Sequence, residues 1–195
     1  GSNLLYVGRE NYHTASNFFV IDTNTNSVVT SVQDFQCLYM VQAIAVSPVN
    51  PNISFIAQRY SYGWKGAKIA KYDRSTDECE ASWNDISFCS PADPDYHEPR
   101  MSITNDGQYL IVCCVGTCRE YSTDTKVDTW SQSIPHYRTN PREVRGVTYT
   151  LDGLGAYFTT YEYDLECGSN PTTCSKSGVI YQLEISSDRT TTSIS

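Results

Sequence analysis

The sequence predicts an all-β protein built from repeated antiparallel strand units, and three observations support this prediction. Tyrosine and threonine are abundant, charged residues make up only 18% of the chain, and no segment shows helical periodicity. This composition favours pleated, half-buried strands. A short hairpin recurs four times, and an apolar strand that ends in a tight turn is interleaved with it. Repeats of this size indicate an array of supersecondary units, none of which can bury its own face alone.

The recurring hairpin is a strand that ends in a polar turn and returns as a second strand. Its turns are rich in Asp, Ser, Thr and Asn, as in Asp22-Thr23-Asn24-Thr25-Asn26. The four copies occupy residues 18–28, 68–78, 119–127 and 179–189.

The interleaved element is an alternating apolar strand followed directly by a tight turn. Residues 41–48 lead into Val49-Asn50-Pro51-Asn52, residues 101–104 into Asn105-Asp106-Gly107, and residues 147–150 into Leu151-Asp152-Gly153.

Taken in order, the chain is predicted to form fifteen strands, which group as three full four-strand units and one unit that lacks its first strand. One stretch, Tyr109-Leu110-Ile111-Val112, is continuously apolar, which predicts a strand covered on both faces. The incomplete unit comes first, and the predicted strands are 4–7, 17–22, 27–32, 41–48, 53–59, 67–73, 78–84, 99–104, 109–115, 118–123, 126–131, 143–150, 155–162, 178–185 and 190–194.

Four-stranded antiparallel units that repeat about every 50 residues are typical of β-propeller blades. We therefore predict an all-β β-propeller of about four four-stranded antiparallel blades, in a single domain that spans residues 1–195. Gly1-Ser2 is interpreted as an expression scar. Three arrangements stay open: a small closed ring, an excised part of a larger propeller, or part of an oligomeric ring. Closure of a small ring would need another segment, such as 190–195, to supply the missing first strand.

The repeat also resembles the YVTN-type β-propeller family. A strand that ends in Ser/Thr-x-Asp-Gly is followed by a Tyr-containing strand and then by a strand that ends in Ile-Asp-Thr. NHL and lactonase-type propellers share this short motif and are neighbours of the family. Members usually have about seven blades and few cysteines, and this chain departs from both features. The segments that support the resemblance are 19–26, 45–48, 102–110 and 148–153.

Eight cysteines in a chain of this length predict disulfide bonds and an oxidising compartment. Zinc ligation fits less well, because no pair of CxxC knuckles occurs. Local pairing is expected for Cys167 with Cys174, Cys114 with Cys118, and Cys79 with Cys89, while pairing of Cys37 with Cys89 and free buried thiols at Cys113 or Cys114 stay open. The eight are Cys37, Cys79, Cys89, Cys113, Cys114, Cys118, Cys167 and Cys174.

Charge and targeting signals exclude several partners. The net charge is −8 and no Lys/Arg cluster occurs, which argues against nucleic acid. No run approaches the ~18 apolar residues of a transmembrane helix, so this segment is not expected to insert into a membrane. Asn52-Ile53-Ser54 is a glycosylation sequon in a predicted turn. Together with the cysteines it predicts a secreted or cell-surface glycoprotein.

The longest predicted connections all fall on one face of such a scaffold, where binding is normally placed. The sharpest candidate is the stretch 59–66, in which aromatic residues and arginine occur together, a composition typical of interface hot spots. The alternative is that Trp64 packs between blades. The tentative binding residues are Arg59, Tyr60, Tyr62, Trp64, Tyr161 and Tyr163.

The sequence gives less support for catalysis. His13, His97 and His136 fall in predicted loops of the same face, and His97 lies near acidic residues. Such a set can bind a metal or transfer protons, but loop histidines are usually only solvated. No catalytic or cofactor motif is present, so no cofactor, metal ligand or catalytic residue is assigned.

We therefore expect a module that binds a protein or a glycan, for example in cell adhesion, and that could form a homo-oligomer completing a propeller ring. The alternatives are a lactonase- or lyase-type enzyme with a metal-assisted site at the channel mouth, and a structural spacer.

Overall fold

The computed structural model describes residues 3–8, 18–32, 41–59, 67–86, 89, 99–114, 116–134, 143–161 and 178–195. This part of the chain contains fifteen strands and no α-helix. The strands are β1 (Leu4–Gly8), β2 (Phe18–Asp22), β3 (Ser27–Val32), β4 (Val41–Val46), β5 (Ile53–Arg59), β6 (Ala67–Asp73), β7 (Glu78–Asp85), β8 (Arg100–Ile103), β9 (Tyr109–Cys114), β10 (Thr117–Ser122), β11 (Asp128–Ser133), β12 (Glu143–Tyr149), β13 (Gly155–Tyr161), β14 (Gly178–Ile185) and β15 (Thr192–Ile194).

The strands form four antiparallel sheets, each in simple sequence order. We call these sheets blade 1 (β1–β3), blade 2 (β4–β7), blade 3 (β8–β11) and blade 4 (β12–β15). The predicted grouping is confirmed, including the three-stranded first blade. In that blade β1 corresponds to the second strand of the others, so the position of the first strand is empty among the described residues.

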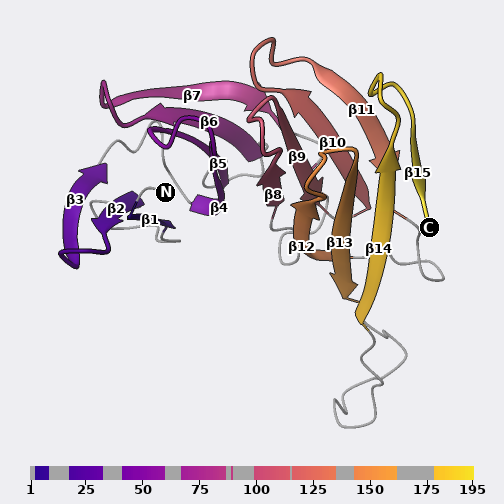
Figure 1. Ribbon diagram of the computed structural model, residues 1–195, viewed down its shortest axis with the longest axis horizontal. Helices are drawn as coiled ribbons and strands as arrows, with labels where there is room; N and C mark the ends of the chain where they lie inside the picture. The colour runs from indigo at the N-terminus through magenta and orange to yellow at the C-terminus, as the bar shows by residue number, and fades with distance from the viewer. Residues whose placement is uncertain are drawn as a thin grey trace, which may run out of the picture.

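The blades stand side by side in an arch (Figure 1). Their innermost strands pack in the order β1, β4, β8 and β12, and the arch does not close from β12 back to β1. The suggestion that the C-terminal tail supplies the missing strand of blade 1 is wrong. Residues 192–194 form β15, which pairs with β14 at the outer edge of blade 4.

Three apolar clusters hold the blades together, one at each junction. The cluster between blades 1 and 2 contains Phe18 and Tyr72, whose rings meet edge to face at 5.3 Å. The cluster between blades 2 and 3 contains Phe55 and Trp83, which also meet edge to face. Phe158 lies in the third cluster. Because both faces of a middle blade are covered, the apolar strand β9 is buried from Leu110 to Cys114, as predicted, and Tyr109 at its start is partly buried.

The turns between the first and second strands depend on short side-chain hydrogen bonds. Thr150 Oγ1 donates to Asp152 Oδ1 at 2.6 Å, and this bond lowers the pKa of that carboxyl. Thr104 makes the same bond to Asp106. Gly153 follows with φ 72°, a left-handed conformation that favours glycine. This chemistry explains why the Thr-x-Asp-Gly pattern marks the ends of β8 and β12.

Each turn between the third and fourth strands contains one residue in the left-handed conformation, and in no case is this residue a glycine. Positive φ angles occur at Asn26, Asp77, Lys126 and Arg189. These positions cost conformational energy for L-residues other than glycine. At two of them the side chain gains a compensating contact with the preceding blade: Lys126 binds Glu80, and Arg189 binds Glu120.

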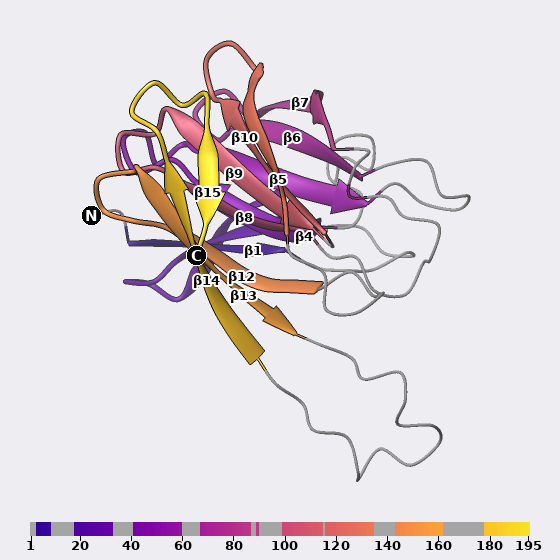
Figure 2. The same cartoon turned by 90° about the vertical axis from the view of Figure 1, so that its right-hand side faces the viewer.

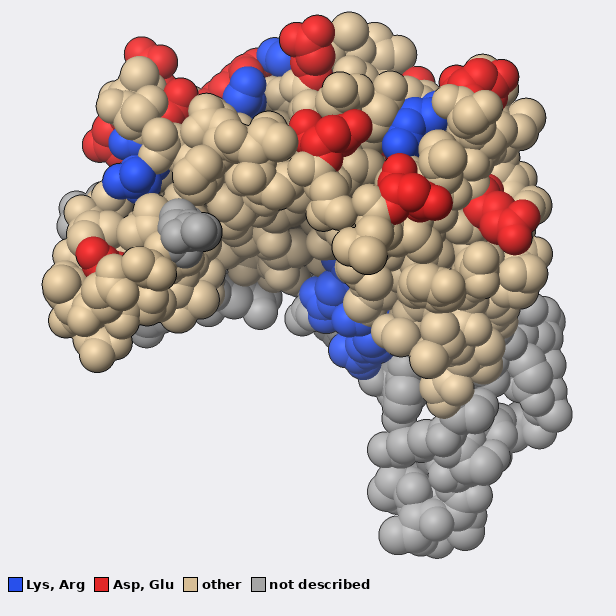
Figure 3. Space-filling view, viewed as in Figure 1, with Lys and Arg blue, Asp and Glu red and all other residues tan. Residues whose placement is uncertain are grey.

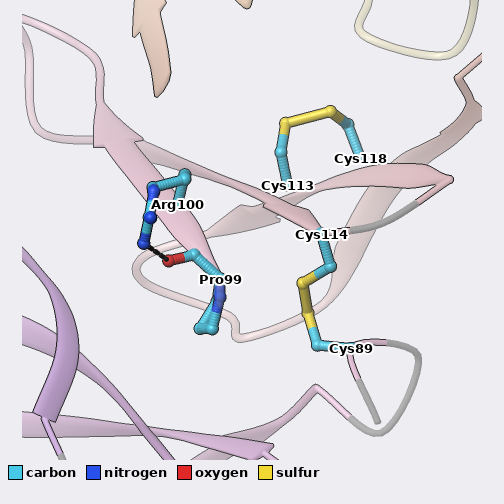
Figure 4. Close-up of a disulfide and its surroundings, with 6 residues drawn as sticks. All are labelled: Cys89, Pro99, Arg100, Cys113, Cys114 and Cys118. Atoms are coloured by element: carbon cyan, nitrogen blue, oxygen red, sulfur yellow. Dashed lines mark hydrogen bonds between the residues drawn. A yellow bond between two sulfur atoms is a disulfide. The ribbon is translucent and has the colours of Figure 1, made fainter. Parts of the chain in front are cut away.

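Two disulfides lie on opposite faces of blade 3 (Figure 4). Cys113 bonds Cys118, and Cys89 bonds Cys114. The predicted pairs Cys114–Cys118 and Cys79–Cys89 are therefore wrong, as is the open alternative of Cys37 with Cys89. Cys113 is the register partner of Cys118 across β9 and β10, whereas Cys114 lies opposite Thr117 and faces blade 2.

Cys79 is also disulfide-bonded, and none of the described cysteines is a free thiol. This finding excludes the alternative of buried thiols at positions 113 and 114. The predicted Cys167–Cys174 pair, like Cys37, lies outside the described residues.

Candidate binding face

The strand order places all the long connections at the same end of the sheets. In an antiparallel meander, the links from second to third strand and from one blade to the next leave from one end, and the remaining links leave from the other. We call the first end the loop rim and the second the turn rim. In Figure 2 the short turns gather opposite the arrowhead of β13. The loop rim is marked by the strand ends Val32, Arg59, Asp85, Cys114, Ser133 and Tyr161 and by the strand starts Val41, Ala67, Arg100, Thr117, Glu143 and Gly178.

Of the six tentative binding residues, the structure places the main chain of two at this rim. Arg59 is the last residue of β5 and Tyr161 is the last residue of β13, so both stand on second strands at the loop rim. Their side chains lie outside the described part, as do Tyr60, Tyr62, Trp64 and Tyr163. The segments 60–66 and 162–177 thus begin and end at the same rim, and the proposed contacts within them stay a prediction.

The predicted glycosylation site stands on the opposite rim, in the turn between β4 and β5. Asn52 is partly buried, and its Oδ1 accepts a hydrogen bond of 2.5 Å from Arg74. A glycan at this position would leave the loop rim uncovered.

Blade 3 differs from its neighbours at the loop rim because β9 and β10 are joined by a short turn. The Cys113–Cys118 bond closes this hairpin, with the two Cα atoms 4.1 Å apart. The Cys89–Cys114 bond then ties the segment that follows blade 2 to the end of β9, with Cα atoms 5.3 Å apart. Both bonds are buried next to the rim, so they fix the base from which the long connections of the neighbouring blades emerge.

Near this rim, the side chain of Arg100 contacts the main chain of Arg145. Arg100 starts β8, and its guanidinium donates to the carbonyl of Arg145 at 3.1 Å and to that of Pro99 at 3.3 Å (Figure 4). Arg145 occupies a β-bulge of β12, a device that redirects a side chain. Figure 3 shows basic groups in the hollow of the arch, whereas acidic groups lie mostly on its convex side. The concave side therefore has a local positive charge in a chain whose net charge is −8.

A second group of charged side chains is buried between blades 3 and 4. The Glu120 carboxylate accepts hydrogen bonds from Thr129 at 2.7 Å, from Tyr149 at 2.6 Å and from Arg189 at 2.6 Å. Arg189 also lies 3.7 Å above the ring of Tyr109. Burial raises the pKa of Tyr149 well above its usual range, and the neighbouring Glu120 charge adds to this effect.

This buried polar group joins blade 3 to blade 4. Glu120 is 0% exposed and both of its oxygens are occupied, so a substrate cannot reach the carboxylate in this arrangement. Its members come from two blades, and removal of any of them would leave a buried charge or hydroxyl unsatisfied.

Metal ligation is not indicated in the part of the chain that the structure describes, where no group of three or more His, Cys, Asp or Glu side chains is placed to hold an ion. His13, His97 and His136 lie outside that part. Of the residues treated above, the sequence interpretation missed Arg100, Arg145 and Glu120. Only the position of the two arginines near the start of first strands offered a signal.

Comparison with known proteins supports the fold and nothing finer. No protein-family model matches the sequence, and no curated protein matches it. Among solved structures, the chain is similar to the hydrazine synthase of Kuenenia stuttgartiensis, a propeller-like protein, with a TM-score of 0.54 and 14% identity. The match covers 98% of this chain and 62% of that one. The chain thus spans less than two thirds of that neighbour.

Proposed function

We propose that this protein is a disulfide-stabilised module of YVTN-type propeller blades that binds a protein or a glycan through its loop rim. The proposal rests mainly on the separation of the connections between the two rims. Short, hydrogen-bonded turns stand on one rim, and every connection longer than those turns starts and ends on the other. A rigid scaffold that presents long loops on one side is the usual design of a binding module.

The disulfides support a working place outside the cell or at its surface. The Cys113–Cys118 bond within blade 3, the Cys89–Cys114 bond that ties the segment after blade 2 to β9, and the bonded state of Cys79 fit an oxidising compartment. In the described part of the chain, no helix is long and apolar enough to cross a bilayer.

The concave side suggests the charge of the ligand. Figure 3 shows basic groups in the hollow of the arch, so a ligand that extends from the loop rim into the hollow would meet these groups. Arginine binds carboxylate and sulfate groups through its planar fork of donors. An acidic glycan or an acidic protein segment fits this side better than a neutral ligand.

The test is binding of the oxidised protein to an array of neutral, sialylated and sulfated glycans and to cultured cells with intact or deglycosylated surfaces. The variants are Tyr62→Ala and Trp64→Ala, in the segment that joins β5 to β6. The matched control is Leu151→Ala on the turn rim, where the side chain is 90% exposed. We expect the loop-rim changes to weaken binding about tenfold or more and the control to leave it unchanged.

Two outcomes would contradict the proposal. Equal loss of binding in the Leu151 control would move the site away from the loop rim. Turnover of a lactone panel in the presence of divalent metal would instead support the enzymatic alternative.

A further inference from the structure

The blades are joined in a fixed direction. We call the face of a blade that contacts the preceding blade its leading face, and the opposite face its trailing face. Phe18 on the trailing face of blade 1 packs on Tyr72 of blade 2, and Phe55 of blade 2 belongs to the same cluster as Tyr121 of blade 3. Ile111 and Phe158 repeat this relation between blades 3 and 4. Every junction thus joins a trailing face to a leading face.

Among the described residues, this rule leaves one leading face and one trailing face without a neighbouring blade. The uncovered leading face belongs to blade 1. On it, Ile21 takes the position that Tyr72, Tyr121 and Ile185 take in the other blades, directly before the turn between the third and fourth strands. Those three residues are 0%, 2% and 5% exposed. The register partners of Ile21 are Leu5 and Val28, which are 50% and 58% exposed.

The uncovered trailing face belongs to blade 4. Tyr157 on it corresponds to Phe55 and Ile111 in blades 2 and 3, because each is the third residue of a second strand. Phe55 is 2% exposed and Ile111 is 0% exposed, but Tyr157 is 43% exposed. Ile180, which lies opposite Thr159 on the same face, is 70% exposed.

The distribution of exposed apolar side chains singles out these two faces. Among the described residues, the large apolar side chains that are exposed on strands all belong to blade 1 or blade 4. They are Leu5, Val28, Val29, Tyr157 and Ile180, and the other exposed ones, Val49, Val127, Leu151 and Leu154, are in turns. Contiguous exposed apolar residues mark interaction surfaces.

We propose that two copies of the chain associate head to tail, so that the trailing face of blade 4 in each copy covers the leading face of blade 1 in the other. This contact continues the relation that already joins the blades within one chain. A heterologous contact forms a closed ring when the rotation per copy closes, and two copies bring together eight sheets, which is within the usual range for propellers. Three copies would bring twelve sheets and exceed it.

The closed pair would also complete the hollow of the arch. The inner strands of two copies would surround it, and each copy would contribute the basic groups that Figure 3 shows in the hollow. The association does not depend on the ligand proposed for the loop rim, because the end faces and that rim are different surfaces.

The first measurement is the absolute mass of the oxidised full chain by light scattering after size exclusion, over a range of concentrations. We expect a species of twice 21.9 kDa. Leu5→Lys on the leading face and Ile180→Lys on the trailing face should each raise the dissociation constant at least about tenfold, because each buries a charge in the contact. Val127→Lys, at a turn residue that is 60% exposed, makes the same charge change away from both faces and should leave the mass unchanged.

Mixing the two variants tests the direction of the contact. An equimolar mixture of Leu5→Lys and Ile180→Lys contains one pair of unaltered faces, so mixed dimers should form although each variant alone is monomeric. A contact between two identical faces would not be restored by mixing. A wild-type monomer at every concentration, a dimer insensitive to both lysines, or a series of larger oligomers would each overturn the proposal. Circular dichroism of both variants verifies that they fold, since each replaced side chain is at least half exposed.

Discussion

At the scale of single residues, the buried carboxylate of Glu120 is the most demanding feature of the molecule. A buried charge is tolerated only when its partners remain in place, and here they come from two strands and one turn of two blades. The sequence could not predict this group. Glu120 stands in an ordinary alternating strand, and its ionic partner Arg189 is 69 residues away along the chain.

Replacing the ionic partner measures the cost of exposing this charge to an apolar interface. We expect Arg189→Met to lower the free energy of unfolding by about 3–5 kcal/mol, because it leaves the Glu120 carboxylate buried without its cation. Lys126→Met is the matched control, since it also removes a cation from a left-handed turn. Its pair with Glu80 is roughly half exposed, and its loss should cost less than about 1 kcal/mol.

Urea unfolding of both variants provides these values. Equal losses in the two variants would contradict the view that burial sets the cost. The double variant Glu120→Leu/Arg189→Met should recover part of the loss, because it removes both charges.

At the scale of elements, the sequence predicted the strands and turns well because these depend on local chemistry. The polar hairpin turns and the Ser/Thr-x-Asp-Gly turns identified where strands end, and the observed boundaries differ from the predicted ones by a few residues at most. Cysteine pairing failed for the opposite reason. Cys113 and Cys114 are adjacent in sequence but point to opposite faces of β9, and only the register with β10 decides which of them meets Cys118.

The two described disulfides are expected to stabilise the protein unequally. Cys89 and Cys114 are separated by 25 residues, whereas Cys113 and Cys118 are separated by five. The loop-closure entropy removed from the unfolded chain corresponds to about 3.5 kcal/mol for the longer loop and about 2 kcal/mol for the shorter one. Replacing each pair by alanine and measuring urea unfolding under oxidising conditions tests this order. A larger loss for Cys113→Ala/Cys118→Ala would show that packing, not chain entropy, dominates.

At the scale of the whole molecule, an open arch of four blades means that stability is distributed over three successive junctions. Each junction depends on its own apolar cluster. In addition, Tyr72 at the first junction and Tyr149 at the third form hydrogen bonds to carboxylates. Tyr72 donates to Asp77 at 2.8 Å, and Tyr149 donates to Glu120. Burial and, for Tyr72, the hydrogen bond to Asp77 raise the pKa values of both tyrosines.

These tyrosines predict alkaline instability. A raised pKa in the folded protein means that the stabilisation is complete below the unfolded value of about 10 and is lost as the pH rises above it toward the folded value. Each tyrosine should contribute a slope of up to about 1.4 kcal/mol per pH unit in that window. Urea unfolding at increasing alkaline pH provides the slope for the wild type, for Tyr72→Phe and for Tyr149→Phe, with Tyr157→Phe as an exposed comparison. Unchanged slopes in both buried variants would exclude these residues as the cause.

The sequence predicted the number of blades and the incomplete first blade, but not how the molecule ends. Whether blade 4 returns to blade 1 depends on the small rotation between successive sheets, which no short motif encodes. The candidate site is similar: the strand order fixes the rim at which Arg59 and Tyr161 stand, whereas the contacts of the loops beyond them depend on residues that no local pattern positions.

The ion pairs of Lys126 and Arg189 with the preceding blade imply that the blades, although alike, are not interchangeable. Arg189 reaches back to an acidic residue in blade 3, and the residue of blade 2 that corresponds to Glu120 is Lys71, directly before Tyr72. Grafting blade 4 directly behind blade 2 would set arginine against lysine inside an apolar junction. A protein with reordered or deleted blades would therefore be destabilised electrostatically even if its strands kept their registers. These contacts thus favour the native order of the blades.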